Sequence, residues 1–584
     1  MTAEQTKIAE ESHVKAPWLN VYGVVPPHLD YPDCTMYEAV EHCAETYPNH
    51  IAYVFMGRKT TYRAMAAGID LCARALKATG VRPGDRITMA MPNCPQAVIM
   101  FYAINLVGAT ANMIHPLSSE KEIEFYLKES GSIFAVTLDQ FYHKFEAIRQ
   151  NVTLDNIILA SIPDALSKPV RVGYMLTEGR KQAKIPKDAP VLRWNEFLRR
   201  GRGYHWTYRA ERRAGDEAVI LYSGGTTGVT KGIQLTNLNF NALGKQIIAT
   251  NPMFRPGDKM LAVMPMFHGF GLGVSIHSML VSGGCCILVP RFTPDSYAKL
   301  LLKYRCNLIA GVPTLYEALL RLPKMKNADL SCLKGVYSGG DSLSVELKKR
   351  FDKFLFDHHA TIQVREGYGL TECVTASCLT PYHISREGSI GIPFPDTYYK
   401  IVEHGTQKEV PYGTEGEICL SGPTVMMGYL HHPEETAQTL QTHEDGLTWV
   451  HTGDLGSMDP DGFVYFRQRL KRMIVTSGYN VYPSQMENIL DAHELVQMSC
   501  VIGVPDPLKM QKVKAFVMLK PGVPANEETK AVLMAYIRKN VAKYALPYDI
   551  EFRAELPKTL VGKVAYRVLE EEELKKLSET AQEQ

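Results

Sequence analysis

Residues 222–232 combine glycines, hydroxyl side chains and a lysine directly after a stretch of strand-like character. Their sequence is Tyr-Ser-Gly-Gly-Thr-Thr-Gly-Val-Thr-Lys-Gly, and residues 217–222 read Glu-Ala-Val-Ile-Leu-Tyr. Because glycine has no Cβ, a loop of this kind can bring backbone N–H groups against phosphate oxygens where it leaves a buried strand. The hydroxyls and Lys231 add donors and a positive charge. The pattern therefore indicates a site for the phosphates of ATP.

This loop departs from the Walker A pattern, in which a glycine is followed by Lys-Ser or Lys-Thr. Here Lys231 precedes Gly232, and no Lys-Ser or Lys-Thr pair follows a correctly spaced glycine. The simpler alternative is a flexible surface loop of glycine, serine and threonine, which the preceding strand disfavours. The loop thus indicates ATP binding although it does not match the usual ATP-binding motif.

Further motifs carry side chains suited to a nucleotide. Residues 365–372 read Arg-Glu-Gly-Tyr-Gly-Leu-Thr-Glu, in which Tyr368 can stack on a purine and Glu372 can hold Mg²⁺ through oxygen. Alone, this motif could equally be a surface turn. Residues 451–454 read His-Thr-Gly-Asp, and the Asp454 carboxylate can accept hydrogen bonds from ribose hydroxyls. Lys563 lies on a glycine turn near the C-terminus, where a solvated surface lysine is the usual interpretation.

Length and composition exclude several classes of protein. A chain of 584 residues is too long for one core, so we expect two or more domains. Its net charge of +2 gives no overall attraction to nucleic acid. The 12 cysteines have no zinc-binding spacing and suit reduced thiols in the cytoplasm, and the polar N-terminus is no signal peptide. The apolar residues 97–113 and 261–290 are interrupted by polar residues or glycines, and are interpreted as buried core rather than membrane spans.

The elements that must position these motifs alternate between helix and strand. Helical patterns at 36–47 and 61–80 alternate with strand patterns at 51–55 and 86–91, and this alternation resumes from 217 to about 402. It predicts layered α/β sheets that are largely parallel. Turn-like motifs at 453–456 and 459–462 precede Arg469, and a smaller set of α/β patterns follows. We therefore predict an N-terminal domain over 1–470 and a C-terminal domain over 471–584.

Residues 168–213 form a strongly basic segment. It holds 13 Lys or Arg against four Asp or Glu, a local charge of +9, with aromatic residues interleaved. One interpretation is a solvated loop packed by its aromatics. The functional alternative is a surface that docks on an anionic membrane or on the phosphates of CoA, which would make a cytoplasmic protein peripheral to a membrane. Nothing recognisable as a nucleic-acid-binding fold accompanies it.

Together, in this order and at these distances, the motifs resemble the adenylate-forming superfamily of acyl- and aryl-CoA synthetases, peptide-synthetase adenylation domains and firefly luciferase. The resemblance runs from about Trp18 to Arg567. It implies a large N-terminal domain of layered α/β sheets with a β-rich subdomain, and a small mobile C-terminal α/β domain. It also implies an enzyme that makes an acyl-adenylate and pyrophosphate from a carboxylic acid and ATP with Mg²⁺. The acyl group then passes to a thiol, usually that of coenzyme A, with release of AMP.

The resemblance also implies a role for each motif. The clamp on the β- and γ-phosphates would be Ser223, Gly224, Gly225, Thr226, Thr227 and Lys231. The adenine pocket would be walled by Gly339, Gly340, Asp341, Gly367, Tyr368 and Gly369. Thr371 and Glu372 would contact Mg-ATP, with Thr226 and Glu372 at the metal, while Asp454 and Arg469 would hold the ribose. Lys563 would stabilise charge during adenylation, and Gly478 would line the CoA channel.

No general base is required of these residues, because a carboxylic acid is already ionised at neutral pH. As the carboxylate attacks the α-phosphorus, negative charge builds on the phosphoryl oxygens, and a fixed ammonium with Mg²⁺ offsets it. One position departs from the family pattern, since Arg472 stands where many relatives have Asp, Glu or Lys at the hinge. The sequence leaves the oligomeric state open, a dimer included.

The identity of the acid is less constrained. Residues 264–273, with His268 as a pocket-lining or gating residue, resemble the start of the acyl-pocket wall in CoA synthetases. Residues 115–117, 120–124 and 162–213 are most similar to long-chain fatty acyl-CoA synthetases, so we expect a medium- to long-chain fatty acid. The alternatives are an aryl or alicyclic acid, an acyl-AMP ligase that loads a carrier protein, and a non-catalytic regulator that binds a nucleotide or an acyl group.

Overall fold

Two large sheets form the body of the protein. The computed structural model describes residues 14–177, 179, 185–186, 188–222, 230–476, 479–506, 509–559 and 563–582. The first sheet has the strand order β16-β15-β14-β13-β12-β10-β11-β1-β2, and its strands from β14 to β1 pair in parallel. The strands are β1 (Ile51–Phe55), β2 (Arg58–Thr61), β10 (Lys259–Ala262), β11 (Cys285–Leu288), β12 (Leu308–Gly311), β13 (Gly335–Ser338), β14 (Val364–Tyr368), β15 (Cys378–Leu379) and β16 (Ile392–Pro393).

The second sheet has the order β19-β9-β8-β4-β3-β5-β6-β7, and its strands from β8 to β7 pair in parallel. The strands are β3 (Arg86–Ala90), β4 (Thr110–Met113), β5 (Phe134–Leu138), β6 (Asn156–Ala160), β7 (Leu192–Arg193), β8 (Glu217–Tyr222), β9 (Gly232–Thr236) and β19 (Gly428–Tyr429). The predicted strand at 217–222 is therefore confirmed. The loop that follows it, 223–229, lies outside the described residues.

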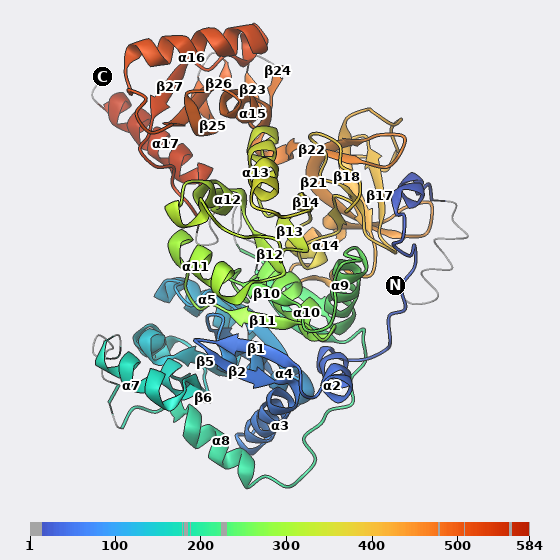
Figure 1. Ribbon diagram of the computed structural model, residues 1–584, viewed down its shortest axis with the longest axis vertical. Helices are drawn as coiled ribbons and strands as arrows, with labels where there is room; N and C mark the ends of the chain where they lie inside the picture. Colours follow the sequence, from blue (N-terminus) through green and yellow to red (C-terminus); the bar gives the residue numbers. More distant parts are fainter. Residues whose placement is uncertain are drawn as a thin grey trace.

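Helices cover both sheets, as the alternating pattern predicts (Figure 1). They include α2 (Met36–Thr46), α3 (Tyr62–Ala78), α4 (Pro95–Leu106), α5 (Glu120–Ser130), α6 (Tyr142–Ala147), α9 (Asn237–Ala249), α10 (Ser278–Leu280), α11 (Pro294–Tyr304), α12 (Pro313–Leu320) and α13 (Val345–Asp357). Local sequence determines where several helices begin. Thr35 with Glu38 forms a capping box at the start of α2, and Ser119 with Glu122 forms one at the start of α5. Helix α4 is buried on nearly all sides, which explains the apolar stretch at 97–113.

A β-rich subdomain and a small α/β domain complete the chain, and Figure 1 shows them side by side at one end of the molecule. The subdomain contains β17 (Tyr398–Val402), β18 (Gly416–Ser421), β20 (Leu440–Thr442), β21 (Thr448–Met458) and β22 (Val464–Arg469), with α14 (Pro433–Thr439) beside it. The small domain contains β23 (Ile474–Thr476), β24 (Tyr479–Val481), β25 (Val496–Asp506), β26 (Met510–Leu519), β27 (Asp549–Phe552), α15 (Pro483–Asp491), α16 (Glu527–Asn540) and α17 (Tyr566–Gln582). The predicted boundary after residue 470 falls in the short helix η9 (Leu470–Arg472), between β22 and β23, and stays a prediction.

One local prediction was wrong, and the structure excludes two of the simpler interpretations. Residues 453–456 are not a turn but the middle of β21, where the register shifts between Leu455 and Gly456 and Gly453 takes a φ of +68°. Residues 365–368 belong to β14 rather than to a turn. The basic segment is not simply a loop, since it contains α7 (Lys168–Leu176) and α8 (Trp194–Arg202).

Candidate active site

Lys563 of the small domain lies against Gly340 of the large domain. A Cβ built on Gly340 would stand 3.3 Å from Cε and 3.9 Å from Nζ of Lys563. Burial lowers the pKa of Lys563; Asp341 and Asp454 act against this shift, and Arg469 adds to it. In this arrangement the small domain therefore places an ammonium group beside two of the predicted adenine-pocket residues.

The predicted ribose contacts form one group around a buried carboxylate. Asp454 on β21 lies opposite Arg469 on β22, and the Arg469 Nε stands 3.2 Å from the Asp454 Oδ1. Tyr368 donates its hydroxyl to the Asp454 Oδ2 at 2.7 Å. Asp454 is 1% exposed, and burial raises its pKa while Arg469 and Tyr368 lower it. Its Oδ1 accepts no hydrogen bond from any described residue, so this buried oxygen suits a donor hydroxyl from a ligand.

Tyr429 connects two residues that the sequence assigns to the phosphate end of the site. Its hydroxyl donates to the Glu372 Oε1 at 2.8 Å. The Lys231 Nζ lies 5.1 Å from the centre of the Tyr429 ring and 3.2 Å from the Glu435 Oε1 on α14. Sequence reasoning missed Tyr429 and Glu435, because neither belongs to a recognised motif. Together they place Lys231 over the Tyr429 ring and Glu372 at the Tyr429 hydroxyl.

The residues present fit a divalent cation in part. Among the described residues, the Glu372 carboxylate bonds only to Tyr429, which fixes its orientation through one oxygen and leaves the other for a hard cation. The second predicted metal contact, Thr226, lies outside the described residues, as do Ser223, Gly224, Gly225 and Thr227 of the same loop. Gly478 of the predicted CoA channel also lies outside them.

The predicted adenine walls follow two neighbouring parallel strands. Residues 339–341 leave β13, and Gly367 and Tyr368 end β14, so both groups lie at the same edge of the sheet. A Cβ on Gly339 would stand 3.3 Å from the Gly367 oxygen, and one on Gly369 only 2.3 Å from the Thr375 oxygen. Gly369 therefore has no room for a side chain. Thr371 follows in the short helix η8 (Thr371–Cys373), next to Glu372.

Residues 264–273, the predicted start of the acyl-pocket wall, pack against the segment that follows Glu372. A Cβ on Gly269 would stand 1.8 Å from the Val374 oxygen, so only glycine allows this approach. Burial and the Lys563 charge lower the pKa of His268 to about 3, and its Nδ1 accepts from the Phe270 N–H at 3.2 Å. A neutral imidazole near Lys563 suits a pocket-lining residue. The π-helix η6 (Phe270–His277) continues the buried wall, as the stretch at 261–290 predicts.

Arg472, at the position of the predicted hinge, is bound within the small domain. Its guanidinium pairs with Glu487 on α15, donates to the Val501 oxygen at 3.3 Å and lies 4.8 Å from the centre of the Tyr566 ring. These contacts come from α15, β25 and α17, so Arg472 anchors the end of the linker to the small domain. This explains how a large charged residue is accommodated at the hinge.

The stability of the small domain is expected to depend on pH through Asp491, which lies near Arg472. Burial raises the pKa of Asp491 on α15 to about 8, Glu487 and Glu317 of α12 add to the rise, and Ser499 donates to its Oδ1 at 2.8 Å. The unfolded carboxyl ionises near pH 4, so its stabilising contribution is complete below that value and is lost as the pH rises through about 8.

Asp491→Asn should remove this pH dependence, because the amide resembles the protonated acid. From about pH 5 to about pH 9, we expect wild-type amides of α15 and β25 to lose protection against hydrogen exchange, corrected for intrinsic rates, and variant amides to keep it. Parallel pH profiles for the two proteins would contradict the assignment.

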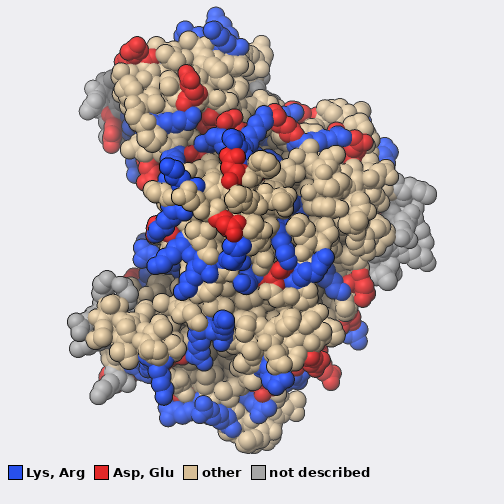
Figure 2. Space-filling view, viewed as in Figure 1, with Lys and Arg blue, Asp and Glu red and all other residues tan. Residues whose placement is uncertain are grey.

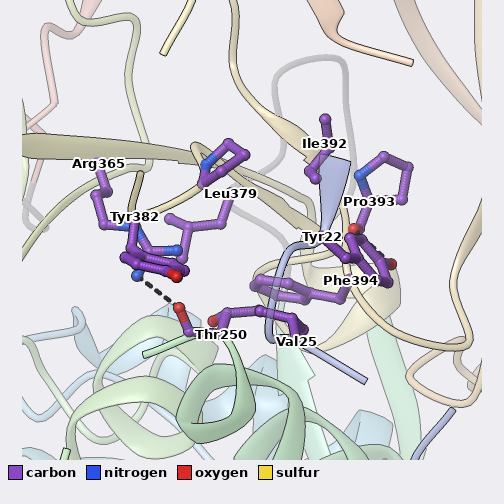
Figure 3. A pocket seen from close by; sticks show the side chains of 10 residues that line it. Tyr22, Val25, Thr250, Arg365, Leu379, Tyr382, Ile392, Pro393 and Phe394 are labelled. Carbon is purple, nitrogen blue, oxygen red and sulfur yellow. Dashed lines mark hydrogen bonds between the residues drawn. The ribbon is translucent and has the colours of Figure 1, made fainter. Parts of the chain in front are cut away.

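A small cavity lies apart from this site (Figure 3). Its lining contains none of the predicted nucleotide-binding residues and consists of Tyr22, Val25, Thr250, Arg365, Leu379, Pro381, Tyr382, Ile392, Pro393 and Phe394. Arg365 donates to the Thr250 oxygen at 3.0 Å and Tyr22 to the Pro393 oxygen at 3.0 Å, so these polar groups stabilise the fold here.

The family follows from this geometry and from the comparisons with known proteins. Residues 40–430 match the model of the AMP-binding enzyme family, and residues 485–563 match that of the AMP-binding enzyme C-terminal domain. The chain belongs to this family of adenylate-forming enzymes. The predicted fold class, a large multi-sheet N-terminal domain with a small C-terminal α/β domain, is confirmed.

Similar proteins cover nearly the whole chain. A long-chain-fatty-acid–CoA ligase of Bacillus subtilis is 36% identical over 565 residues, 95% of this chain and 98% of that protein. One of Salmonella typhimurium is 33% identical over 570 residues, 96% and 98% of the two chains. Among solved structures, ATP-bound MatB from Rhodopseudomonas palustris is 25% identical with a TM-score of 0.79, covering 92% of this chain and 99% of that one. The anthranilate CoA ligase AuaEII with anthranoyl-AMP is 25% identical with a TM-score of 0.79, covering 93% and 97%.

Proposed function

We propose that this chain is an AMP-forming acyl-CoA synthetase that activates medium- to long-chain fatty acids. The observation that carries the chemistry is the contact of Lys563 with Gly340 near the buried Asp454 and its partner Arg469, which brings an ammonium group to the predicted nucleotide contacts. Near-full-length similarity to long-chain-fatty-acid–CoA ligases supports the class of acid.

In this proposal each residue acts on ATP or on the acid. The Asp454 Oδ1, which is paired with Arg469, also accepts from a ribose hydroxyl, and Tyr368 holds the other oxygen of that carboxylate in place. Glu372, with Thr226, would hold Mg²⁺, which neutralises phosphate charge when bound. Lys231 contacts the departing pyrophosphate, and Lys563 stabilises charge on the α-phosphoryl group.

The two half-reactions balance without any oxidant or reductant. A carboxylate oxygen of the acid bonds to the α-phosphorus of ATP, and the bond to pyrophosphate breaks. The sulfur of coenzyme A then bonds to the acyl carbon, its thiol proton passes to solvent, and AMP leaves with the bridging oxygen. Gly478 would line the approach of the thiol.

A panel of acids tests the substrate class. We expect octanoate, laurate, palmitate and oleate to give labelled acyl-CoA, and benzoate and cyclohexane carboxylate to give much less, because residues 115–117, 120–124 and 162–213 are most similar to long-chain fatty acyl-CoA synthetases. Product from the aryl or alicyclic acids alone would replace the fatty-acid assignment. Acyl-AMP that accumulates without a CoA thioester would favour loading of a carrier protein, and no acid-dependent ATP–pyrophosphate exchange would favour a non-catalytic regulator.

We also propose that the basic segment contacts an anionic membrane. Apolar side chains are exposed on α7, with Val172 at 60%, Met175 at 50% and Leu176 at 56%, and Trp206 is 72% exposed. Arg199, Arg200 and Arg202 lie on the neighbouring helix α8. Figure 2 shows Lys and Arg gathered along α8 at the same end of the molecule as the mainly uncharged surface of α7. Apolar side chains beside cations suit the interface of an anionic bilayer.

Vesicle co-sedimentation measures this contact. We expect binding to vesicles that contain phosphatidylserine at low salt, weaker binding at high salt because surface attraction is screened, and little binding to phosphatidylcholine alone. The double variant R199Q/R200Q should bind less, whereas Lys349→Gln, an exposed lysine on α13, should bind like the wild type. Binding that does not change with salt would refute the proposal.

A further inference from the structure

Three different metal-ligand types meet on one face of the β-rich subdomain. Glu417 and Cys419 are two residues apart on β18, so their side chains lie on the same face of the strand. His451 on β21 lies directly opposite Cys419 in the antiparallel pairing. One potential ligand atom of each residue lies within 4.8 Å of those of the other two. The sheet pairing therefore brings a carboxylate, a thiol and an imidazole together.

The Glu417 carboxylate is the centre of this group. Its Oε2 lies 3.1 Å from the His451 Nδ1 and 3.9 Å from the Nδ1 of His404, whose side chain is 64% exposed. Its Oε1 accepts from the Gly453 N–H at 2.9 Å, which fixes the plane of the carboxylate. Glu417 and Cys419 are buried, whereas His404 stands at the surface. An ion could thus enter past His404, and this imidazole is available as a fourth ligand.

A further histidine, His443, contacts the second ring nitrogen of His451 and so orients its ring. The Nε2 atoms of His443 and His451 are 3.0 Å apart and share a hydrogen bond. The ring centres of His443 and Trp449 are 5.8 Å apart. Histidines that bind a metal commonly bond through their second ring nitrogen to an outer group, which fixes the ring and its tautomer. His443 is placed to do this for His451, whose Nδ1 faces Glu417.

We propose that Glu417, Cys419 and His451 form a binding site for a divalent transition-metal ion of the Zn²⁺ class, with His404 as the fourth ligand. Thiolate and imidazole ligands suit Zn²⁺, whereas Mg²⁺ binds through oxygen, so this site is distinct in chemistry from the one proposed at Glu372. Zinc–ligand bonds of about 2.0–2.3 Å place tetrahedral ligands roughly 3.5 Å apart, so Glu417, Cys419 and His451 need to move together by about 1 Å and His404 needs to turn in from the surface. Binding releases the thiol proton of Cys419 to solvent.

Cobalt(II) is the spectroscopic probe for this site, used on the full chain after treatment with a chelator and without nucleotide. We expect a thiolate-to-cobalt charge-transfer band that saturates at about one ion per chain and that Zn²⁺ displaces. Cys419→Ser should abolish the band, whereas Cys34→Ser, which removes a half-buried thiol elsewhere, should keep it. Glu372→Gln should also keep it, because Glu372 lies outside the cluster.

If Cys419→Ser does not fold, measurements of Zn²⁺ affinity on other variants still test the proposal. His443→Gln should weaken Zn²⁺ binding roughly 10- to 100-fold in equilibrium dialysis, since it removes the outer partner of a ligand. His451→Gln should weaken it further. The proposal is overturned if the folded wild type gives no band, if the band survives in Cys419→Ser or disappears in Cys34→Ser, or if the histidine variants bind Zn²⁺ like the wild type.

Discussion

Lys563→Ala is expected to slow formation of the acyl-adenylate by roughly 100- to 1,000-fold, because it removes a positioned charge from the transition state. Lys563 reaches Gly340 from another domain, and burial strengthens its electrostatic effect. Fatty-acid-dependent ATP–pyrophosphate exchange measures this half-reaction. Transfer of the acyl group from supplied acyl-adenylate to coenzyme A should change little, since charge on the phosphoryl group is then already established.

Lys558→Ala is the matched control for this variant. Lys558 lies on the same C-terminal segment, but its side chain is 43% exposed and pairs with Glu555 at 3.2 Å. We expect both half-reactions to be unaffected by its loss, because an exposed pair of this kind contributes little. Equal loss of both half-reactions in Lys563→Ala would assign Lys563 a structural role instead.

Asp454→Asn is expected to weaken binding of ATP by roughly 10- to 100-fold, the cost of about 1.5–3 kcal/mol for a hydrogen bond to a charged group. The reason is the buried Oδ1, which faces Arg469 and has no hydrogen-bond donor among the described residues. Titration calorimetry under conditions without turnover measures the affinity.

Dideoxy-ATP separates a ribose contact from a general disturbance of the site. The wild type should bind it more weakly than ATP, and Asp454→Asn should bind both nucleotides with similar affinity, since the two changes remove the same interaction. Tyr368→Phe, which keeps the carboxylate, should lose less than about tenfold. If Asp454→Asn still discriminates between the nucleotides as strongly as the wild type, Asp454 does not hold the ribose.

Local sequence patterns predicted the elements well where one rule dominated. Helical periodicity located α2 to within a residue, and the apolar run at 217–222 is β8. Strand β25 runs over Val496–Asp506, and its ends are fixed by pairing with β26 rather than by their own composition. The Gly-Asp-Leu-Gly sequence at 453–456 resembles a turn, but a register shift accommodates it within β21.

The site required contacts that no local pattern encodes. At the predicted adenine walls, the close approaches at Gly369 leave no room for another residue. The placement of Lys563 beside Gly340 depends on how two domains pack, and Tyr429 and Glu435 enter the site through β19 and α14. The cluster around Glu417 has irregular sequence spacing, and antiparallel pairing of β18 with β21 creates it. No zinc-binding sequence motif therefore contains it.

The most direct test of the proposed function follows one oxygen atom. A fatty acid labelled with heavy oxygen in its carboxylate is incubated with the enzyme, ATP, Mg²⁺ and coenzyme A, and the products are examined by mass spectrometry. The proposal predicts acyl-CoA, unlabelled pyrophosphate and AMP that carries one labelled oxygen, because the carboxylate attacks the α-phosphorus and AMP leaves with the bridging atom. Unlabelled AMP, or label in inorganic phosphate together with ADP, would contradict it.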